Sequence, residues 1–180
     1  MEQVYNNLIA GNAWLTIIKG IGVTVKISVL SLLLGTIIGA LVCGMRRSKV
    51  RIFSTFAKIY IAILRGSPVS MLLLLFYYGI FARSPLNAVT VAVLAFGMNT
   101  GAYVAELLRT ALDATDKGQV EAARTLGFSK WQAFRLITLP QALQIAKPVY
   151  QSTIVNLIQW TSVVGYVTIT DLTRVINNFS

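Results

Sequence analysis

Four apolar stretches, each long enough to cross a lipid bilayer as a helix, constrain the fold of this chain more than any other feature. A helix needs about 20 residues to cross the hydrocarbon, and a spanning segment must satisfy its own backbone hydrogen bonds. The 180 residues are 56% hydrophobic and only 12% charged, which agrees with a single membrane domain rather than a soluble core. We therefore predict an all-α, polytopic membrane protein with spans at about 20–45, 56–82, 86–108 and 144–168.

The segment before the first span, residues 1–19, contains Trp14 among polar side chains and is predicted to be an interfacial lead-in on the outer side. Residues 20–180 form the membrane domain. Within the first span small residues recur on one stripe at helical spacing, including Gly35 and Gly39. Such a stripe lets a neighbouring backbone approach closely, so its predicted role is helix packing rather than transport chemistry.

The formal net charge of +10 is concentrated in two loops, and this argues against a nucleic-acid-binding protein. Eleven of the sixteen basic residues follow the first span or surround the loop between the third and fourth: Arg46, Arg47, Lys49, Arg51, Lys58, Arg109, Lys117, Arg124, Lys130, Arg135 and Lys147. The positive-inside rule places both loops in the cytoplasm, with the N-terminus outside.

The residue inventory leaves the chain without the usual means of catalysis. Cys43 is the single cysteine, there is no histidine, and no Gly-rich phosphate loop ending in Lys-Ser or Lys-Thr occurs. We therefore expect no catalytic residue, no metal site and no cofactor in this chain. Energy for any transport must come from a partner protein or from an ion gradient.

The polar loop at 116–140 is predicted to contain two short helices, and the first begins at Asp116. Asp116 is a good N-cap with Gln119 at the third helical position, the arrangement of a capping box, and Gly127 can adopt the left-handed conformation that ends the helix. The result is an ordered elbow on one side of the membrane.

The second helix of the elbow is predicted to begin at Ser129, with Gln132 completing a capping box. Pro140 has no backbone N–H, so this helix should end or kink there. Trp131 and Phe134 would then lie at the headgroup boundary.

The elbow contains a spaced pattern that resembles the EAA loop of ABC-transporter permease subunits. The matching positions are Glu121, Ala122, Ala123, Gly127, Ile137, Leu139 and Pro140. The flanking stretch 102–146 resembles bacterial polar-amino-acid permeases of the His/Glu/Gln/Arg type. The resemblance implies a type I ABC transmembrane domain of MetI-like fold. A simpler alternative is an amphipathic interfacial helix that only anchors the loop.

The resemblance also implies the partners. The first elbow helix would be a coupling helix for a cytoplasmic ATPase, so Glu121, Ala122, Ala123, Gly127, Leu139 and Pro140 are the expected coupling residues. Two ATP-binding subunits would hold ATP and Mg, and a second permease subunit would complete the pathway. An external binding protein would deliver the amino acid to this complex in a bacterial inner membrane. Such relatives usually have a fifth span, so the chain is expected to be a fragment.

Arg65-Gly66-Ser67-Pro68 interrupts the second predicted span. Proline disfavours the helical conformation at the residue before it, so we expect the helix to break or kink there. An arginine at membrane depth needs a partner or a function. Alternatively, Arg65 marks the cytoplasmic boundary of a shorter span that begins at Pro68. Relatives in the resembled family carry Arg-Gly-Thr-Pro at the start of their pore-side helix.

Two spans carry polar stripes at helical spacing, which suggests a protein-lined path: Asn99, Tyr103, Glu106 and Thr110 on the third, and Ser152, Asn156, Gln159 and Ser162 on the fourth. Many relatives have Lys-Asp-Thr-Ser where this chain has Gln159-Trp160-Thr161-Ser162. The missing acid makes a specifically cationic substrate less favourable, and Trp160 offers an apolar or cation-π surface instead.

The predicted substrate path therefore comprises Arg65, Ser67, Asn99, Tyr103, Glu106, Asn156, Gln159, Trp160 and Thr161. Arg65 is the candidate for a substrate carboxylate and Glu106 for an ammonium, unless Glu106 pairs locally with Arg109 or Thr110. The predicted function is the permease subunit of an ATP-driven amino acid importer. The alternative is a gradient-driven transporter or channel.

Overall fold

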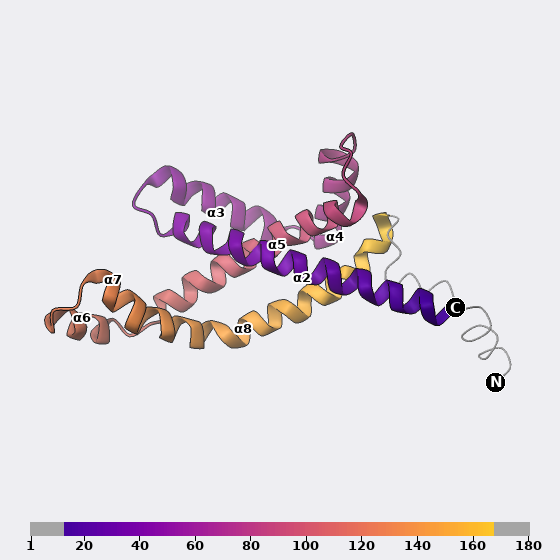
Figure 1. Ribbon diagram of the computed structural model, residues 1–180. Helices are drawn as coiled ribbons and strands as arrows, with labels where there is room; N and C mark the ends of the chain where they lie inside the picture. Colours follow the sequence, from indigo (N-terminus) through magenta and orange to yellow (C-terminus); the bar gives the residue numbers. More distant parts are fainter. Residues whose placement is uncertain (1–12, 168–180) are drawn as a thin grey trace.

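The computed structural model describes residues 13–167, and every regular element in this range is helical (Figure 1). In chain order the elements are α2 (Ala13–Arg46), α3 (Arg51–Gly66), α4 (Val69–Leu74), the π-helix η2 (Leu75–Ile80), α5 (Ala88–Asp113), α6 (Lys117–Thr125), α7 (Lys130–Ala133), the π-helix η3 (Phe134–Thr138), α8 (Leu139–Trp160) and the 3₁₀-helix η4 (Thr161–Val167). The all-α fold class predicted from the sequence is confirmed.

Helices α2 and α5 run parallel and touch through glycines on both sides. A Cβ placed on Gly39 would lie 2.6 Å from Val104 Cβ, and one placed on Gly97 would lie 2.6 Å from Leu34 Cδ2. The predicted small-residue stripe of the first span therefore packs against a Gly-xxx-Gly pair, Gly97 and Gly101, on α5. Helix α8 returns antiparallel to both, as the hydrogen-bonded pair Thr36 and Tyr150 and the tilted chain path in Figure 1 indicate.

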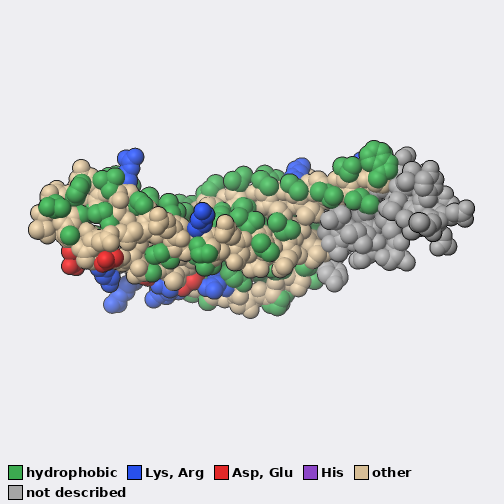
Figure 2. Space-filling view, turned by 90° about the horizontal axis from the view of Figure 1, so that it is seen from below, with side chains coloured by type: hydrophobic (Ala, Val, Ile, Leu, Met, Phe, Trp, Pro, Cys, Tyr) green, Lys and Arg blue, Asp and Glu red, His purple; other side chains and the backbone are tan. Residues whose placement is uncertain are grey.

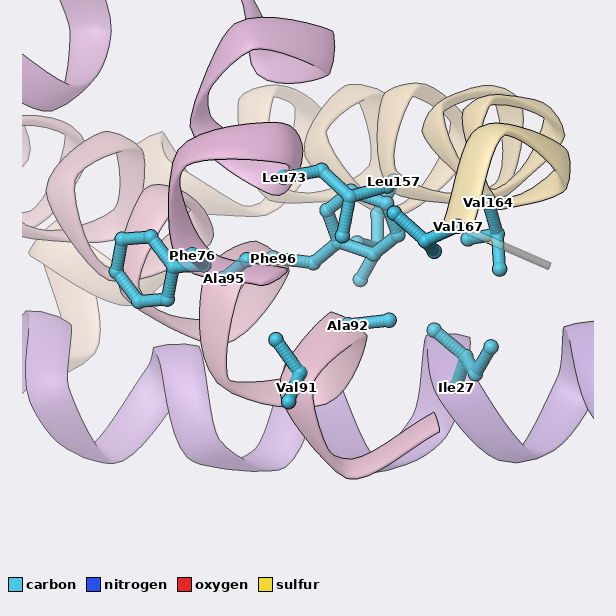
Figure 3. Packing of buried hydrophobic residues seen from close by; sticks show 10 residues of the cluster. All are labelled: Ile27, Leu73, Phe76, Val91, Ala92, Ala95, Phe96, Leu157, Val164 and Val167. Carbon is cyan, nitrogen blue, oxygen red and sulfur yellow. The ribbon is translucent and has the colours of Figure 1, made fainter. Parts of the chain in front are cut away.

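Among the described residues, the largest cluster of buried apolar side chains is the core drawn in Figure 3. Its members come from six elements, α2, α4, η2, α5, α8 and η4: Ile27, Leu73, Phe76, Val91, Ala92, Ala95, Phe96, Leu157, Val164 and Val167. Through this core α4 and η2 pack against the long helices of the bundle, although their axis has turned away from that of α3. The chain therefore leaves α3 and still packs against the same α5.

The helix bounds differ from the predicted spans at several ends, and α3 and α8 each begin five residues before the predicted span. Helix α2 already begins at Ala13, so residues 13–19 belong to the first helix, while residues 1–12 of the predicted lead-in lie outside the described range. Helix α5 extends to Asp113. The fourth predicted span becomes 3₁₀ from Thr161, where the Thr161 and Ser162 hydroxyls donate to the carbonyls three residues earlier.

Two of the described helices, Ile17–Arg46 within α2 and α5, are long and apolar enough to cross a membrane on their own. The bent pair α3 and α4–η2 makes a third if it is one span. Helix α8 contains glutamine, asparagine and lysine side chains and is less apolar, so its role as a fourth span stays a prediction.

The two basic loops lie at the same end of the bundle. An ion pair between Arg47 and Asp113 joins the end of α2 to the end of α5, next to the two loops that follow these helices. Figure 2 shows charged side chains gathered mainly toward the end that carries the elbow. This shared end is the arrangement that the positive-inside argument requires.

Candidate functional site

The helix break predicted at Arg65–Pro68 is confirmed. Helix α3 ends at Gly66, Pro68 is the N-cap of α4, and the axes of the two segments differ by 108°. Pro68 cannot continue the helical hydrogen-bond pattern of α3, and it pushes Ser67 into an extended conformation (φ −97°, ψ 140°). Local chemistry alone therefore accounts for the position of the break.

Arg65 lies at the bend, with its guanidinium over the ring of Tyr103 at 5.1 Å from the ring centroid. Tyr103 in turn contacts Trp160, with ring centroids 5.5 Å apart. From Tyr103 to the end of α5 at Asp113 is roughly 15 Å at 1.5 Å per residue, half of a 30 Å hydrocarbon core. This depth favours the intramembrane interpretation of Arg65 over the boundary interpretation.

Two hydrogen bonds hold the end of α3 on α5. The hydroxyl of Tyr60 donates to the carbonyl of Met98 at 2.6 Å, and Asn99 Nδ2 donates to the carbonyl of Leu64 at 3.3 Å. Asn99 is 1% exposed, and its Oδ1 has no hydrogen-bond partner. Asn99 was predicted to line the substrate path, but here it is buried behind the bend and positions the turn that carries Arg65.

Glu106 does not meet Arg65 in this conformation. Its Oε1 accepts from Arg109 at 2.6 and 3.1 Å, and Arg109 also pairs with Asp113 at 2.7 Å. Asp113 is shared with Arg47 of α2. The four side chains form one ion-pair chain at the root of the elbow, which is the local alternative considered for Glu106.

The predicted path residues on α8 do not face Asn99. Asn156 and Gln159 are exposed, whereas Leu157 of the same helix is buried in the core. Thr161 is 2% exposed, and its hydroxyl donates to the carbonyl of Ile158. Within the described residues, the structure thus brings together only Arg65, Tyr103 and Trp160, with Asn99 behind them. The hydroxyl of Ser67, which follows α3, donates to the carbonyl of Ile63 in that helix.

The first elbow helix, α6, is closed at both ends by its own backbone and side chains. Asp116 Oδ1 accepts from the N–H of Gly118 at 2.8 Å. Gly127 has φ +90°, and the amides of Gly127 and Phe128 donate to the carbonyls of Arg124 and Ala123, the Schellman pattern. The left-handed cap at Gly127 is therefore confirmed.

The capping box predicted between Asp116 and Gln119 is wrong. Gln119 Oε1 instead accepts from Gln141 Nε2 at 2.6 Å, and Gln141 Oε1 accepts from the Asp116 amide at 3.4 Å. A partner 22 residues away along the chain thus replaces the local contact. This link connects the start of the elbow to the start of α8.

The second elbow helix begins as predicted but does not end at Pro140. Ser129 and Gln132 form the reciprocal capping box, at 2.7 and 3.1 Å. The chain then stays helical, passing from α7 through the π-helix η3 into α8, with Pro140 in the first turn of α8. Pro140 has no N–H for the carbonyl four residues earlier, and the wider π-turn accommodates this loss just before it.

The elbow presents most of its predicted coupling residues outward. Glu121, Ala122, Gly127 and Pro140 are exposed and Leu139 is half-buried. Ala123 is 4% exposed and forms the inner side of α6. Glu121 and Ala122 are exposed while the next residue, Ala123, is buried, so one face of α6 is free. A docking protein could contact this face.

Sequence reasoning missed Tyr60, Gln141 and the pair Gly97 and Gly101. The spacing of the two α5 glycines, identical to that of Gly35 and Gly39, is a signal that could have been recognised. Tyr60 and Gln141 show no such signal, because their partners lie 38 and 22 residues away.

Comparisons with known proteins agree with this architecture. The family described as binding-protein-dependent transport system inner membrane component matches residues 31–180. The chain is 38% identical to the "Probable amino-acid ABC transporter permease protein YckA" of Bacillus subtilis, covering 95% of this chain and 76% of YckA. It is 32% identical to the L-cystine transport system permease protein TcyL of the same organism, covering 96% and 75% of the two chains.

A solved structure, described as an amino acid ABC transporter with histidines, superposes with a TM-score of 0.86 at 31% identity. The match covers 95% of this chain and 80% of that chain. The chain therefore belongs to the family of binding-protein-dependent transport system inner membrane components and is a membrane-embedded permease subunit of an ABC importer.

Proposed function

We propose that this permease subunit carries amino acids and that Arg65 receives the substrate carboxylate at the bend. The observation that carries the proposal is a cation without an acid: among residues 13–167, Arg65 contacts the Tyr103 ring and takes part in none of the ion pairs. A guanidinium in a low-dielectric region favours a carboxylate that it can bind through two hydrogen bonds. The relatives YckA and TcyL, named for amino acid and L-cystine transport, support this substrate class.

The substrate ammonium needs its own partner, and we assign this role to Glu106. Glu106 lies about one helical turn from Tyr103 on α5. Its present bond to Arg109 must open before an ammonium can replace the guanidinium. Exchange of one cation for another keeps the charge balance, so this step suits a conformational change within the transport cycle.

The exposed face of α6 is the proposed dock for a cytoplasmic ATPase, which would bind ATP and Mg, while this chain holds no cofactor and performs no catalysis. Two ATPases, a second permease subunit and an external amino-acid-binding protein would complete the importer in a bacterial inner membrane, with the N-terminus outside. The exposed Asn156 and Gln159 support a second subunit, since polar groups in a span need cover from protein. Closure of the ATPases would move the elbows and reorient the two permeases around the substrate.

The test is amino acid uptake by the assembled transporter in vesicles, with Arg65→Ala, Arg65→Lys and Glu106→Gln. We expect Arg65→Ala to weaken substrate affinity roughly tenfold to a hundredfold, because a hydrogen bond to a charged group contributes about 1.5–3 kcal/mol. Lysine keeps the charge but loses the planar fork, so it should restore uptake only in part.

Arg83→Ala is the matched control, since Arg83 is an exposed arginine beyond the bend and should leave uptake unchanged. ATPase recovery on co-purification shows whether the variants still assemble. Parental uptake by both Arg65→Ala and Glu106→Gln would disprove the assignment and move the path to Asn156 and Gln159.

A further inference from the structure

We propose that the cleft between α2 and α8 binds an anionic phospholipid, with an acyl chain along the cleft and the phosphate at its elbow end. The cleft consists of two cavities, of about 250 and about 350 Å³, which share Leu108 and Leu143 in their walls. Helices α2, α5 and α8 all contribute to it. Nothing in the proposal depends on which amino acid is transported.

The cleft lies between α2 and α8, both of which pack on α5. Thr36 and Tyr150 share a hydrogen bond of 2.7 Å that bridges the two helices at the deep end. From there toward the elbow the walls carry small side chains, among them Ala40, Gly44 and Ala142. Small residues on both helices leave space that larger ones would fill.

The length of the cleft fits one leaflet of a bilayer. From Thr36 to Arg47 on α2 is roughly 16 Å at 1.5 Å per residue, against about 15 Å for half of the hydrocarbon core. Because the cleft starts at the elbow end and stops at the Thr36–Tyr150 bridge, it matches the depth that an acyl chain of the adjoining leaflet occupies. The leucine side chains along it, Leu108, Leu112 and Leu143, suit such a chain.

The charges at the cleft select the headgroup. Arg47 lines the cavity at the elbow end, and Lys147 lines the deeper one. Arg47 shares its charge with Asp113, whereas Lys147 forms no ion pair within residues 13–167. A long lysine side chain can keep its stem in the apolar cleft and extend its ammonium toward the surface, where a phosphate binds.

The order of side chains along the cleft suits a lipid. Apolar side chains line the larger cavity and Arg47 lies at its elbow end, the order in which an acyl chain and its phosphate follow one another. Phe134 and Leu139 of the elbow also line the cleft, so the bound chain would support the base of the coupling region.

The experiment uses the assembled transporter in nanodiscs, with phosphatidylglycerol or phosphatidylcholine carrying a diazirine on the acyl chain. Cross-links mapped by mass spectrometry should fall on peptides that contain Leu108 and Leu143, and should favour phosphatidylglycerol. The double variant Arg47→Gln/Lys147→Gln should lower this labelling roughly thirtyfold, because each basic residue near an anionic headgroup contributes about 1 kcal/mol to lipid binding. Leu143→Trp should abolish it by filling the shared wall.

Lys58→Gln is the control, because Lys58 is an exposed lysine of α3 outside the cleft walls and its loss should not change the labelling. Equal labelling by both lipids, or cross-links that the double variant leaves unchanged, would overturn the proposal, as would cross-links that map outside the peptides of Leu108 and Leu143.

Discussion

The bend at Arg65–Pro68 and the elbow at 116–140 both interrupt a helical chain, but different ranges of contact hold them. In the elbow, the bonds that cap α6 and α7 join residues at most five positions apart, such as Phe128 to Ala123 and Ser129 to Gln132. At the bend, the two bonds that hold α3 on α5 join residues 35 and 38 positions apart.

The difference separates what each region can do. The elbow keeps its shape through its own contacts, so it can move as a unit when a partner pushes on it, limited mainly by the Gln119–Gln141 link and the start of α8. The bend keeps its shape only while α3 and α5 stay in contact, so any rearrangement of the bundle alters the surroundings of Arg65. A docking surface needs to keep its shape while it moves, as the elbow can. A substrate site needs surroundings that change during transport, as those of the bend do.

The largest effect is expected from Gly101→Ala, which disturbs the long-range packing around the bend. The new Cβ would lie 2.8 Å from Ile38 Cγ2 and 3.2 Å from the Tyr60 hydroxyl, so Ile38 of α2 must shift and the Tyr60 side chain of α3 must give way slightly. Overpacking of this kind costs about 1–3 kcal/mol. Unfolding of the purified permease in increasing denaturing detergent should show the loss of stability.

Gly22→Ala serves as the matched control within a membrane helix, since its Cβ meets nothing within 4 Å. It should be neutral or slightly stabilising because alanine favours the helix. Equal behaviour of the two variants would show that the glycine contacts do not set the packing of α3 on α5.

The next largest effect is expected from Gly127→Val, which disturbs the local cap of α6 in the elbow. At φ +90° a β-branched residue is strained, at about 1–2 kcal/mol for an ordinary side chain in left-handed backbone. We expect ATPase recovery on co-purification to fall while the unfolding of the bundle stays parental. Gly127→Asn should keep most of the recovery, because asparagine tolerates this backbone. A loss of bundle stability with Gly127→Val would show that the two regions are not independent.

The same contrast decides how far the sequence predicts the structure. The cap at Gly127, the box of Ser129 with Gln132 and the break before Pro68 follow from neighbours in sequence, and all three are confirmed. The capping box of Gln119 was wrong, because Gln119 bonds to Gln141 instead. Of the two outcomes expected at Pro140, an end of the helix was wrong, because the chain stays helical through a π-turn just before the proline.

The candidate site shows the same limit. Arg65 and Tyr103 were identified from their residue types, and the structure brings them together. The buried position of Asn99 depends on which side of α5 meets α3, and periodicity marks a polar face without saying what covers it. The exposed position of Asn156 and Gln159 depends in the same way on how α8 lies on α5.

The smallest effects come from a matched pair, Tyr60→Phe and Ser129→Ala, each of which removes one hydroxyl. Tyr60→Phe deletes the bond to Met98 and should cost about 0.5–1.5 kcal/mol, while Ser129→Ala deletes the cap of α7 and should cost about 1 kcal/mol. The two losses of stability are similar, but we expect them to change different measurements. Tyr60→Phe should lower bundle stability and substrate affinity, since α3 then holds Arg65 less firmly, and leave ATPase recovery unchanged. Ser129→Ala should lower ATPase recovery alone, and Ser129→Thr should restore it. If both variants changed both readouts to the same extent, local and long-range contacts would not separate the two regions.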